Sequence, residues 1–321
     1  MILVIGASGR IGGEAARLLA ASGEAVRALV RTPARAADLV GAGVELVQGD
    51  LVDPGSLDRA MEGAHRVLLV SAQDLNQAEL QGNAVDAAVR AGVGHLVKVS
   101  GIGPSVSPGG PAAIGRQHWQ TEHRIEQSGV PFTFLRPGFF MQNLLTTAAP
   151  AIASTGVLAA PMGGAPIAMV DARDIASAAA AVLASDTHHN QVYDITGPRA
   201  VSYHQLARII GDTTGCAVSY LDTPPVMAAA ALRRQGHPDW YIHHLLEMAG
   251  LFRSGAGAAV SPAVAELTGQ APRSLEAFVA EHVAEFTPNG GSAAVRAAAR
   301  LGIGITARVS GLLSPGTRRT P

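Results

Sequence analysis

Short apolar runs alternate with alanine-rich stretches along the first half of the chain. The runs are rich in Val, Ile and Leu and lack a polar face, which is typical of strands buried on both sides. Strands that alternate with helices form a parallel sheet covered on both faces. We expect strands at residues 2–5, 26–30, 44–47, 67–70, 95–99 and 132–135, and helices at residues 12–21, 57–61, 77–91 and 116–127. The pattern therefore predicts an α/β fold with a doubly wound parallel sheet.

The second half is less regular and predicts a smaller, mainly helical part with no internal repeat. We expect helices at residues 171–183 and 202–212, strands at 192–195 and 218–221, and helices after Pro225 that end with residues 275–286. Residues 137–170 carry no charge, but prolines and polar residues interrupt them, so we interpret this stretch as buried loops and a short helix near a ligand cleft. We expect this part to lie over the carboxyl ends of the strands.

A glycine-rich loop joins the first predicted strand to the first predicted helix and reads GASGRIG from residue 6 to residue 12. Gly6 permits a sharp turn, Gly9 removes a side chain that would obstruct a pyrophosphate, and Gly12 permits close contact between helix and strand. The helix N-terminus presents free N–H groups and a positive dipole to phosphates. This context predicts a dinucleotide-binding Rossmann domain. The predicted phosphate contacts are Gly6, Ser8, Gly9, Arg10, Ile11 and Gly12.

The end of the second predicted strand favours NADP(H) over NAD(H). An NAD-specific site needs an acidic residue there to accept the ribose hydroxyl groups, and residues 26–37 contain none. Arg31 instead offers guanidinium donors to a 2′-phosphate, to which Arg10 and Arg35 could add. The alternative is that Arg31 is only a solvated surface charge.

Six segments carry a family resemblance: GASGRIG, LVRTPARA, VQGDLVDPGSL, HLVKVSG, HWQTEHRIEQSGVPFTFLRPGFFMQN and YDITGP. With them, the chain from Met1 to about Phe286 resembles the NmrA-like family of atypical short-chain dehydrogenases, which includes NAD(P)H-dependent quinone oxidoreductases. The resemblance implies adenine contacts near Asp50 and Leu51, and ribose contacts near Ser71, Ala72 and Gln73. It implies nicotinamide contacts near Ser100, His118, Pro137, Gly138, Phe139 and Phe140. Asp50 could equally be a turn residue, and Ser71 only a strand-end residue.

The acceptor site is expected beyond the sixth predicted strand. Phe139, Phe140 and Met141 could form an apolar platform for a flat acceptor, although packing in the core explains them as well. We name Phe140 and Asn143 as the substrate-binding candidates.

The usual catalytic pair of short-chain dehydrogenases, a Tyr and a Lys four residues apart, is missing. No tyrosine precedes Tyr193, and the only lysine, Lys98, lies inside the fifth predicted strand instead of on the following helix. His118 on that helix is the catalytic candidate, because an imidazole can donate a proton or a hydrogen bond to a carbonyl at neutral pH. A histidine on the helix surface without a role is the alternative. A quinone can take its protons from solvent, so the missing pair is compatible with quinone reduction.

Two classes of function follow. The first is an NADPH-dependent oxidoreductase that transfers a hydride to a quinone or a similar flat carbonyl acceptor. The second is a catalytically silent NADP(H)-sensing regulator that acts through a protein partner. The net charge of −1 gives no general attraction to nucleic acid, and one cysteine and scattered histidines predict neither a disulfide nor a metal site. We expect a cytoplasmic protein without a membrane span. The sequence carries no signal for an oligomeric state.

The expected division places an NAD(P)-binding Rossmann domain at residues 1–153 and a smaller substrate-binding part at residues 154–287. Segments near residues 171–196 are expected to return to the Rossmann sheet. Residues 288–321 contain five arginines and no acidic residue, and we expect them to form a flexible basic tail.

Overall fold

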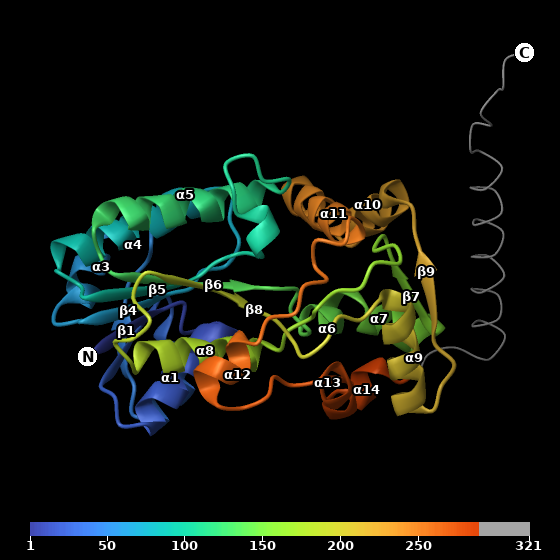
Figure 1. The fold of residues 1–321 in the computed structure, drawn as a ribbon, viewed down its shortest axis with the longest axis horizontal. Coiled ribbons are helices and arrows are strands. Elements are labelled where there is room, and N and C mark those ends of the chain that lie inside the picture. Colours follow the sequence, from blue (N-terminus) through green and yellow to red (C-terminus); the bar gives the residue numbers. More distant parts are fainter. Residues whose placement is uncertain (289–321) are drawn as a thin grey trace, which may run out of the picture.

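The computed structural model describes residues 1–288 and contains a seven-stranded sheet in the order β3-β2-β1-β4-β5-β6-β8 (Figure 1). Every neighbouring pair in this sheet is parallel. The strands are β1 (Ile2–Ile5), β2 (Val26–Val30), β3 (Glu45–Gln48), β4 (Arg66–Leu69), β5 (His95–Val99), β6 (Phe132–Pro137) and β8 (Gln191–Ile195). The strand order reverses between β1 and β4, at the kind of switch point where such sheets bind ligands. The predicted doubly wound α/β fold is confirmed.

Helices cover both faces of the sheet (Figure 1). One face carries α3 (Pro54–Met61), α4 (Gln77–Arg90) and α5 (Ala113–Ser128), and the other carries α1 (Arg10–Ala21), α8 (Ala172–Leu183) and α12 (Ala263–Thr268). The short elements η1 (Pro33–Ala36), α2 (Ala37–Gly41) and η2 (Gly103–Ser105) lie in the connections. Alternate residues of one strand supply opposite cores: Ile2 and Val4 pack toward α1, and Leu3 and Ile5 pack toward α3 and α4. Burial on both faces is why these strands lack a polar side.

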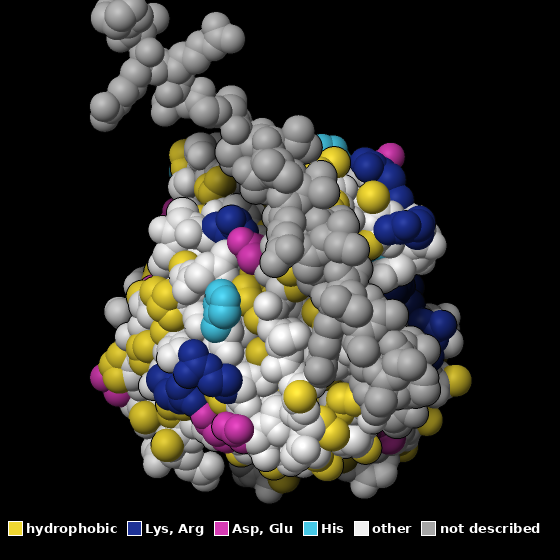
Figure 2. Space-filling model, turned by 90° about the vertical axis from the view of Figure 1, so that its right-hand side faces the viewer, with side chains coloured by type: hydrophobic (Ala, Val, Ile, Leu, Met, Phe, Trp, Pro, Cys, Tyr) yellow, Lys and Arg dark blue, Asp and Glu magenta, His cyan; other side chains and the backbone are white. Residues whose placement is uncertain are grey.

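The remaining elements form a cap at the carboxyl ends of the strands (Figure 1). They are α6 (Asn143–Thr147), α7 (Ala149–Thr155), β7 (Val157–Ala160), α9 (Tyr203–Thr214), β9 (Ser219–Asp222), α10 (Pro225–Arg234), α11 (Asp239–Arg253), α13 (Leu275–Glu281) and α14 (Val283–Phe286). β7 and β9 pair in parallel, and a separate core around Phe252, Phe278 and Phe286 holds the cap together. Figure 2 shows the cap end, where acidic and basic side chains are interspersed among apolar ones outside the grey residues.

The chain passes between sheet and cap more than once. After β6 it enters the cap, and it then returns with α8, which packs against α1, and with β8, which pairs with β6. α9 to α11 belong to the cap again, and α12 returns to pack against α8. Sheet and cap are therefore interwoven along the sequence.

Side chains directly before two helices cap their N-termini. Asp53 caps α3 by accepting a hydrogen bond from the Gly55 N–H, and Ser202 begins α9 with a reciprocal capping box to Gln205. The helix predicted at residues 275–286 is interrupted, because His282 has φ −112° and ψ 28° between α13 and α14. The uncharged stretch holds two helices and β7, more regular structure than predicted.

No helix among residues 1–288 is long and apolar enough to cross a membrane. The basic tail predicted for residues 288–321 lies, from residue 289 onward, outside the described residues.

Candidate active site

The loop between β1 and α1 has the shape of a phosphate cradle. Gly6 has a φ of +84°, and a Cβ there would lie 2.2 Å from the carbonyl oxygen of Val70. A Cβ on Gly12 would lie 2.5 Å from the carbonyl oxygen of Gly6, so the fold itself requires both glycines. Gly9 is different, because it is exposed and a Cβ there would approach only the Gly6 oxygen, at 3.2 Å. The space in front of Gly9 is therefore open to a ligand.

The N-terminus of α1 is free to receive an anion. Gly9 is its N-cap residue, no side chain caps the helix, and its first turn contains no acidic residue. Arg10 and Arg31 are exposed on neighbouring elements, and neither has an ion-pair partner within residues 1–288. Asp38, the first carboxylate after β2, instead bonds to Arg17, which lowers the pKa of that carboxyl group. No carboxylate therefore competes with a phosphate at Arg31.

Of three other residues predicted at or near this loop, two are exposed and one is buried. Ser8 is exposed, and Arg35 is exposed in η1. Ile11 is only 6% exposed and packs in the core beneath the loop. Its backbone N–H alone remains for a ligand.

Asp50 and Leu51 follow β3 and make local contacts. The Asp50 carboxylate accepts a hydrogen bond from the Val52 N–H at 3.2 Å, which is the turn interaction that the sequence left as an alternative. The Leu51 carbonyl accepts a hydrogen bond from the Asn83 side chain at 2.9 Å, and this bond ties the segment to α4. The adenine contacts assigned to these two residues stay predictions.

Ser71, Ala72 and Gln73 follow β4 at the same edge of the sheet. The Ser71 hydroxyl accepts a hydrogen bond from buried Gln81 at 2.8 Å, whereas Ala72 and Gln73 are exposed. Their exposure leaves them accessible to a ligand at the switch point.

His118 lies at the centre of a polar cluster that the sequence analysis did not predict. Its Nδ1 is 2.8 Å from Nζ of Lys98, which in turn lies 3.3 Å from the Ser100 hydroxyl. Lys98 is completely buried, and His118 is half-buried against Gly101, where a Cβ would lie 2.9 Å from the imidazole Cδ2. His118 is thus not a free residue of the helix surface. The structure brings together His118 and Ser100, and it adds Lys98, which the sequence argument had set aside because it lies in a strand.

Burial governs the ionisation of this cluster. It lowers the pKa of Lys98 to about 7, with Glu122 opposing the change and Arg136 adding to it. It also holds the pKa of His118 well below the ordinary value, and the neighbouring Lys98 and His244 lower it further. His118 is therefore a neutral imidazole at pH 7.

Buried Glu122 and half-buried Arg136 form an ion pair behind the cluster. Arg136 on β6 binds Glu122 on α5 through two hydrogen bonds, one of them 3.2 Å long, and the Glu122 side chain is 3% exposed. The bonds raise the pKa of Arg136, so the guanidinium stays charged. The pair fixes α5 to β6 one helical turn after His118.

Backbone contacts hold the segment after β6 in place. The Phe139 carbonyl accepts from the Val170 N–H and the Met141 N–H donates to the Val170 carbonyl, each at 2.9 Å. Met141 is a core residue at 1% exposure, and half-buried Phe140 packs against the core on the α1 and α8 side. Phe139 is the aromatic residue that faces the cap, so the three side chains do not form one platform.

The other residues of this segment have structural ties. Pro137 is buried at the end of β6, and the Gly138 N–H donates to the Ile195 carbonyl at 2.9 Å. Asn143 is half-buried at the start of α6. Their assigned cofactor and substrate contacts stay predictions.

Helix α11 closes the site from the cap. Its Glu247 accepts a hydrogen bond from the Ala113 N–H at 3.1 Å and so docks the helix on the N-terminus of α5. The Phe252 ring packs edge-on against Phe139 with 5.6 Å between ring centroids. His244 is 6% exposed, near enough to lower the pKa of His118, and its buried Nδ1 has no partner among the described residues.

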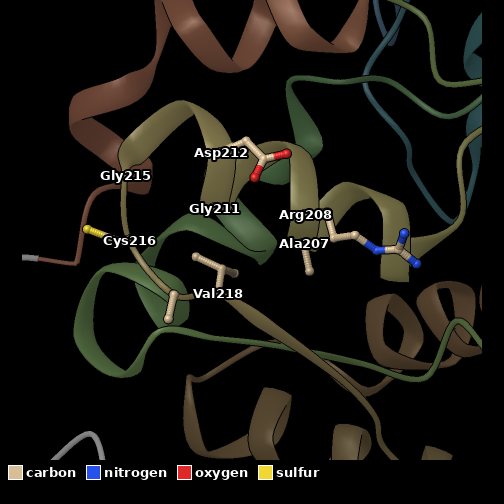
Figure 3. A pocket seen from close by; sticks show the side chains of 8 residues that line it. Ala207, Arg208, Gly211, Asp212, Gly215, Cys216 and Val218 are labelled. Atoms are coloured by element: carbon tan, nitrogen blue, oxygen red, sulfur yellow. The ribbon is translucent and has the colours of Figure 1, made fainter.

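A separate open groove of about 430 Å³ lies within the cap, between α9 and the turn before β9 (Figure 3). Arg208 and Asp212 line it from one helix, and Cys216 lines it from the turn. None of the predicted site residues lines this groove. No group of three or more His, Cys, Asp or Glu within residues 1–288 is arranged to hold a metal ion.

A doubly wound sheet with a glycine loop after its first strand and a cap over its carboxyl edge defines a Rossmann-type α/β protein. Residues 1–279 match the NmrA-like family, and the chain belongs to this family. The family resemblance in the sequence is thereby confirmed.

Relatives of similar length carry reductase names. The chain is 36% identical to the NAD(P)H azoreductase of Xenophilus azovorans over 286 residues, which cover 89% of this chain and 99% of that protein. It is 38% identical to the (4-alkanoyl-5-oxo-2,5-dihydrofuran-3-yl)methyl phosphate reductase of Streptomyces griseus over 288 residues, 90% of this chain and all of that protein. A solved NADPH-dependent quinone oxidoreductase from Escherichia coli, in complex with NADPH, matches with a TM-score of 0.80 at 31% identity, covering 88% of this chain and 99% of the other.

Proposed function

We propose that this protein is an NADPH-dependent oxidoreductase that transfers a hydride to a quinone or a similar flat, conjugated acceptor. The observation that carries the proposal is a half-buried His118 backed by Lys98 at the sheet edge that also holds the open glycine loop. His118 and Lys98 supply a proton donor in a chain that lacks the usual catalytic Tyr–Lys pair. The family, and the reductase names of its members with 36% and 38% identity, support this class of reaction.

The residues at the switch point fit NADPH. The free N-terminus of α1 and the open space at Gly9 would hold the pyrophosphate, and Arg31 with Arg10 would hold the 2′-phosphate. Bound NADPH supplies a hydride from its nicotinamide ring. The segment 137–139 and Ser100, at the carboxyl ends of β6 and β5, would border the nicotinamide.

His118 acts as hydrogen-bond donor and proton donor to the acceptor. A neutral imidazole is suited to this role, because it polarises a carbonyl or azo group without placing a charge in the cleft. Phe139 and Phe252 supply the apolar surface from the sheet and from the cap. We propose that Phe140, three residues before α6, and Asn143, its first residue, also contact the substrate.

The names of the relatives support a conjugated electrophile as the acceptor. Their names refer to an azo group, a dihydrofuranone and a quinone, and each is a planar system that accepts a hydride and a proton. The aromatic surface of Phe139 and Phe252, with His118 as a polar donor, suits this chemistry better than it suits an aliphatic alcohol. A quinone is the acceptor that we propose first.

The decisive experiment follows NADPH oxidation at 340 nm with quinones, azo dyes, substituted dihydrofuranones and aldehydes as acceptors, with NADH in parallel. We expect turnover with a quinone and a preference for NADPH. Absence of turnover with every acceptor would refute the enzyme. In that case a protein partner captured only at one NADP⁺/NADPH ratio would support the sensing regulator.

A further inference from the structure

Lys98 and His118 form a pair with one hidden and one accessible member. Lys98 has no exposed surface, so its ammonium group cannot reach a ligand. His118 is half-buried, and its Nδ1 is the ring atom 2.8 Å from the lysine. The other side-chain neighbour of Lys98, the Ser100 hydroxyl at 3.3 Å, is only 6% exposed, so His118 is the more accessible route for a proton that leaves Lys98.

The contact with Lys98 selects the tautomer of the ring. An ammonium group has donors only, so Nδ1 must accept its hydrogen bond and the ring hydrogen must lie on Nε2. The amide nitrogen of Gln77 lies 3.1 Å from Nδ1 and 3.2 Å from Nε2, and the buried Gln77 Oε1 has no partner among the described residues. With this amide turned over, Oε1 accepts a hydrogen bond from Nε2–H, which agrees with the same tautomer. The lysine therefore sets the tautomer.

We propose that Lys98 is the internal proton source of the site, a positioning residue that works through His118 and holds its Nε2 hydrogen ready for the acceptor. As a step in turnover, the inference rests on the function proposed above. The tautomer and the exchangeable lysine proton are properties of the protein alone.

The step balances in atoms and charge. The acceptor gains a hydride, with its electron pair, from bound NADPH and a proton from Nε2 of His118. Nδ1 takes one proton from the ammonium group, which leaves a neutral imidazole and a neutral amine. Water in the cleft then returns a proton to Nε2, and Nδ1 gives its proton back to Lys98. The net proton comes from solvent, although the lysine itself never meets water.

The surrounding charges allow the lysine to exchange a proton near neutrality. Burial lowers the pKa of Lys98 to about 7. Glu122 of α5 opposes this, but Arg136 of β6 binds that carboxylate and adds a repulsion of its own. His244 of α11 acts on His118 and favours the neutral ring. An acid whose pKa lies near the pH of the reaction gives up and regains its proton readily.

The test uses the fact that Lys98 is the only lysine of the chain. Full-length protein labelled with ¹³Cε-lysine gives one side-chain signal, which needs no assignment and no cofactor. We expect this signal to titrate with a midpoint near pH 7. A midpoint above about pH 9, close to that of a free lysine, would overturn the proposal.

A second readout follows His118 in protein labelled with ¹⁵N-histidine, with its signal identified by His118→Gln. The ring should hold its hydrogen on Nε2 below pH 7 and lose this preference in step with the lysine. The Lys98→Gln side chain still donates a hydrogen bond to Nδ1 but does not titrate, so the change in the His118 signal near pH 7 should vanish. Lys98→Met, which fills the same space without a donor, serves if the Gln variant does not fold. If the folded variant still shows this change near pH 7, the proposed proton transfer from Lys98 through His118 (the relay) is contradicted.

Turnover distinguishes the two proposals. With an active quinone, kcat of the parent protein should fall above pH 7, and Lys98→Gln should lose this dependence with kcat reduced about tenfold or more. Identical pH profiles for the two proteins would refute the relay and leave the oxidoreductase standing. No turnover at all would refute the oxidoreductase. The lysine and histidine signals would still show whether Lys98 titrates near pH 7 and sets the tautomer of His118.

Discussion

A buried histidine at the opposite end of the sheet predicts a loss of stability in mild acid. His95 begins β5 and is 1% exposed, with its Nε2 2.8 Å from the Thr133 hydroxyl and its ring edge-on to His189. Its Nδ1 is buried and has no partner within residues 1–288. Burial, with repulsion from His189 and Arg66, lowers the pKa of His95 from 6.5 to about 4. The folded protein therefore keeps this ring neutral where the unfolded chain protonates it.

The sign and the size follow from linkage. Between pH 6.5 and pH 4 the unfolded state binds more protons at this position, so the free energy of unfolding falls as the pH falls. Above pH 6.5 the residue contributes no pH dependence. A gap of roughly two and a half pH units at about 1.4 kcal/mol per unit sets an upper limit of about 3 kcal/mol. Most of it, about 2–3 kcal/mol, is lost by about pH 4.5.

The assay is urea unfolding at pH 7 and pH 4.5, comparing the parent protein with His95→Gln. The variant retains a hydrogen bond to Thr133 but cannot be protonated, so its loss between the two pH values should be smaller by about 2–3 kcal/mol. The exposed His123→Gln should match the parent. Equal losses in the parent and in His95→Gln would refute the reasoning.

Three further predictions concern the proposed active site. Arg31→Ala should weaken NADPH binding by about 1–3 kcal/mol and NADH binding little, measured by cofactor fluorescence, with exposed Arg59→Ala as control; equal losses for both cofactors would remove the 2′-phosphate contact. Gly9→Val should abolish cofactor binding while the thermal midpoint falls only slightly, since the only atom of the described residues that its Cβ would approach is the Gly6 oxygen, at 3.2 Å; retained affinity would place the phosphate site elsewhere. His118→Ala should lower kcat with an active acceptor by about 10²-fold, with cofactor affinity nearly unchanged and His123→Ala near normal; a loss below about tenfold would leave solvent as the donor.

The sequence predicted the sheet well because buried parallel strands and glycine loops are encoded locally. β5 begins and ends at the expected residues, and the N-termini of α3 and α9 are capped by the adjacent side chains of Asp53 and Ser202. The cap was harder. A strand was predicted at residues 218–221, where β9 lies, but its partner β7 lies some sixty residues earlier, in the stretch predicted to form loops and a short helix. β7 has no period of its own, so its pairing with β9 defines it.

The candidate site shows the same difference between features encoded locally and features that depend on tertiary packing. The glycine loop is contiguous in the sequence, whereas the contact of Lys98 with His118 depends on how α5 packs against β5. A lone lysine inside an apolar strand was the available signal, because a buried ammonium group needs a partner. Phe139 and Phe140, adjacent in sequence, separate into different cores because the segment pairs with Val170.

The repeated crossing of the chain between sheet and cap limits how this protein can be recombined with its relatives. A cut at residue 153 would remove β8 from the edge of β6 and strip α8 from α1. A chimaera that borrows another member's acceptor specificity must therefore retain residues 172–195 and α12 from the parent, with junctions on both sides of each. Exchange of the cap as one cassette would leave an unpaired strand edge, which is a template for aggregation. New specificity in this architecture is reached by substitution in place.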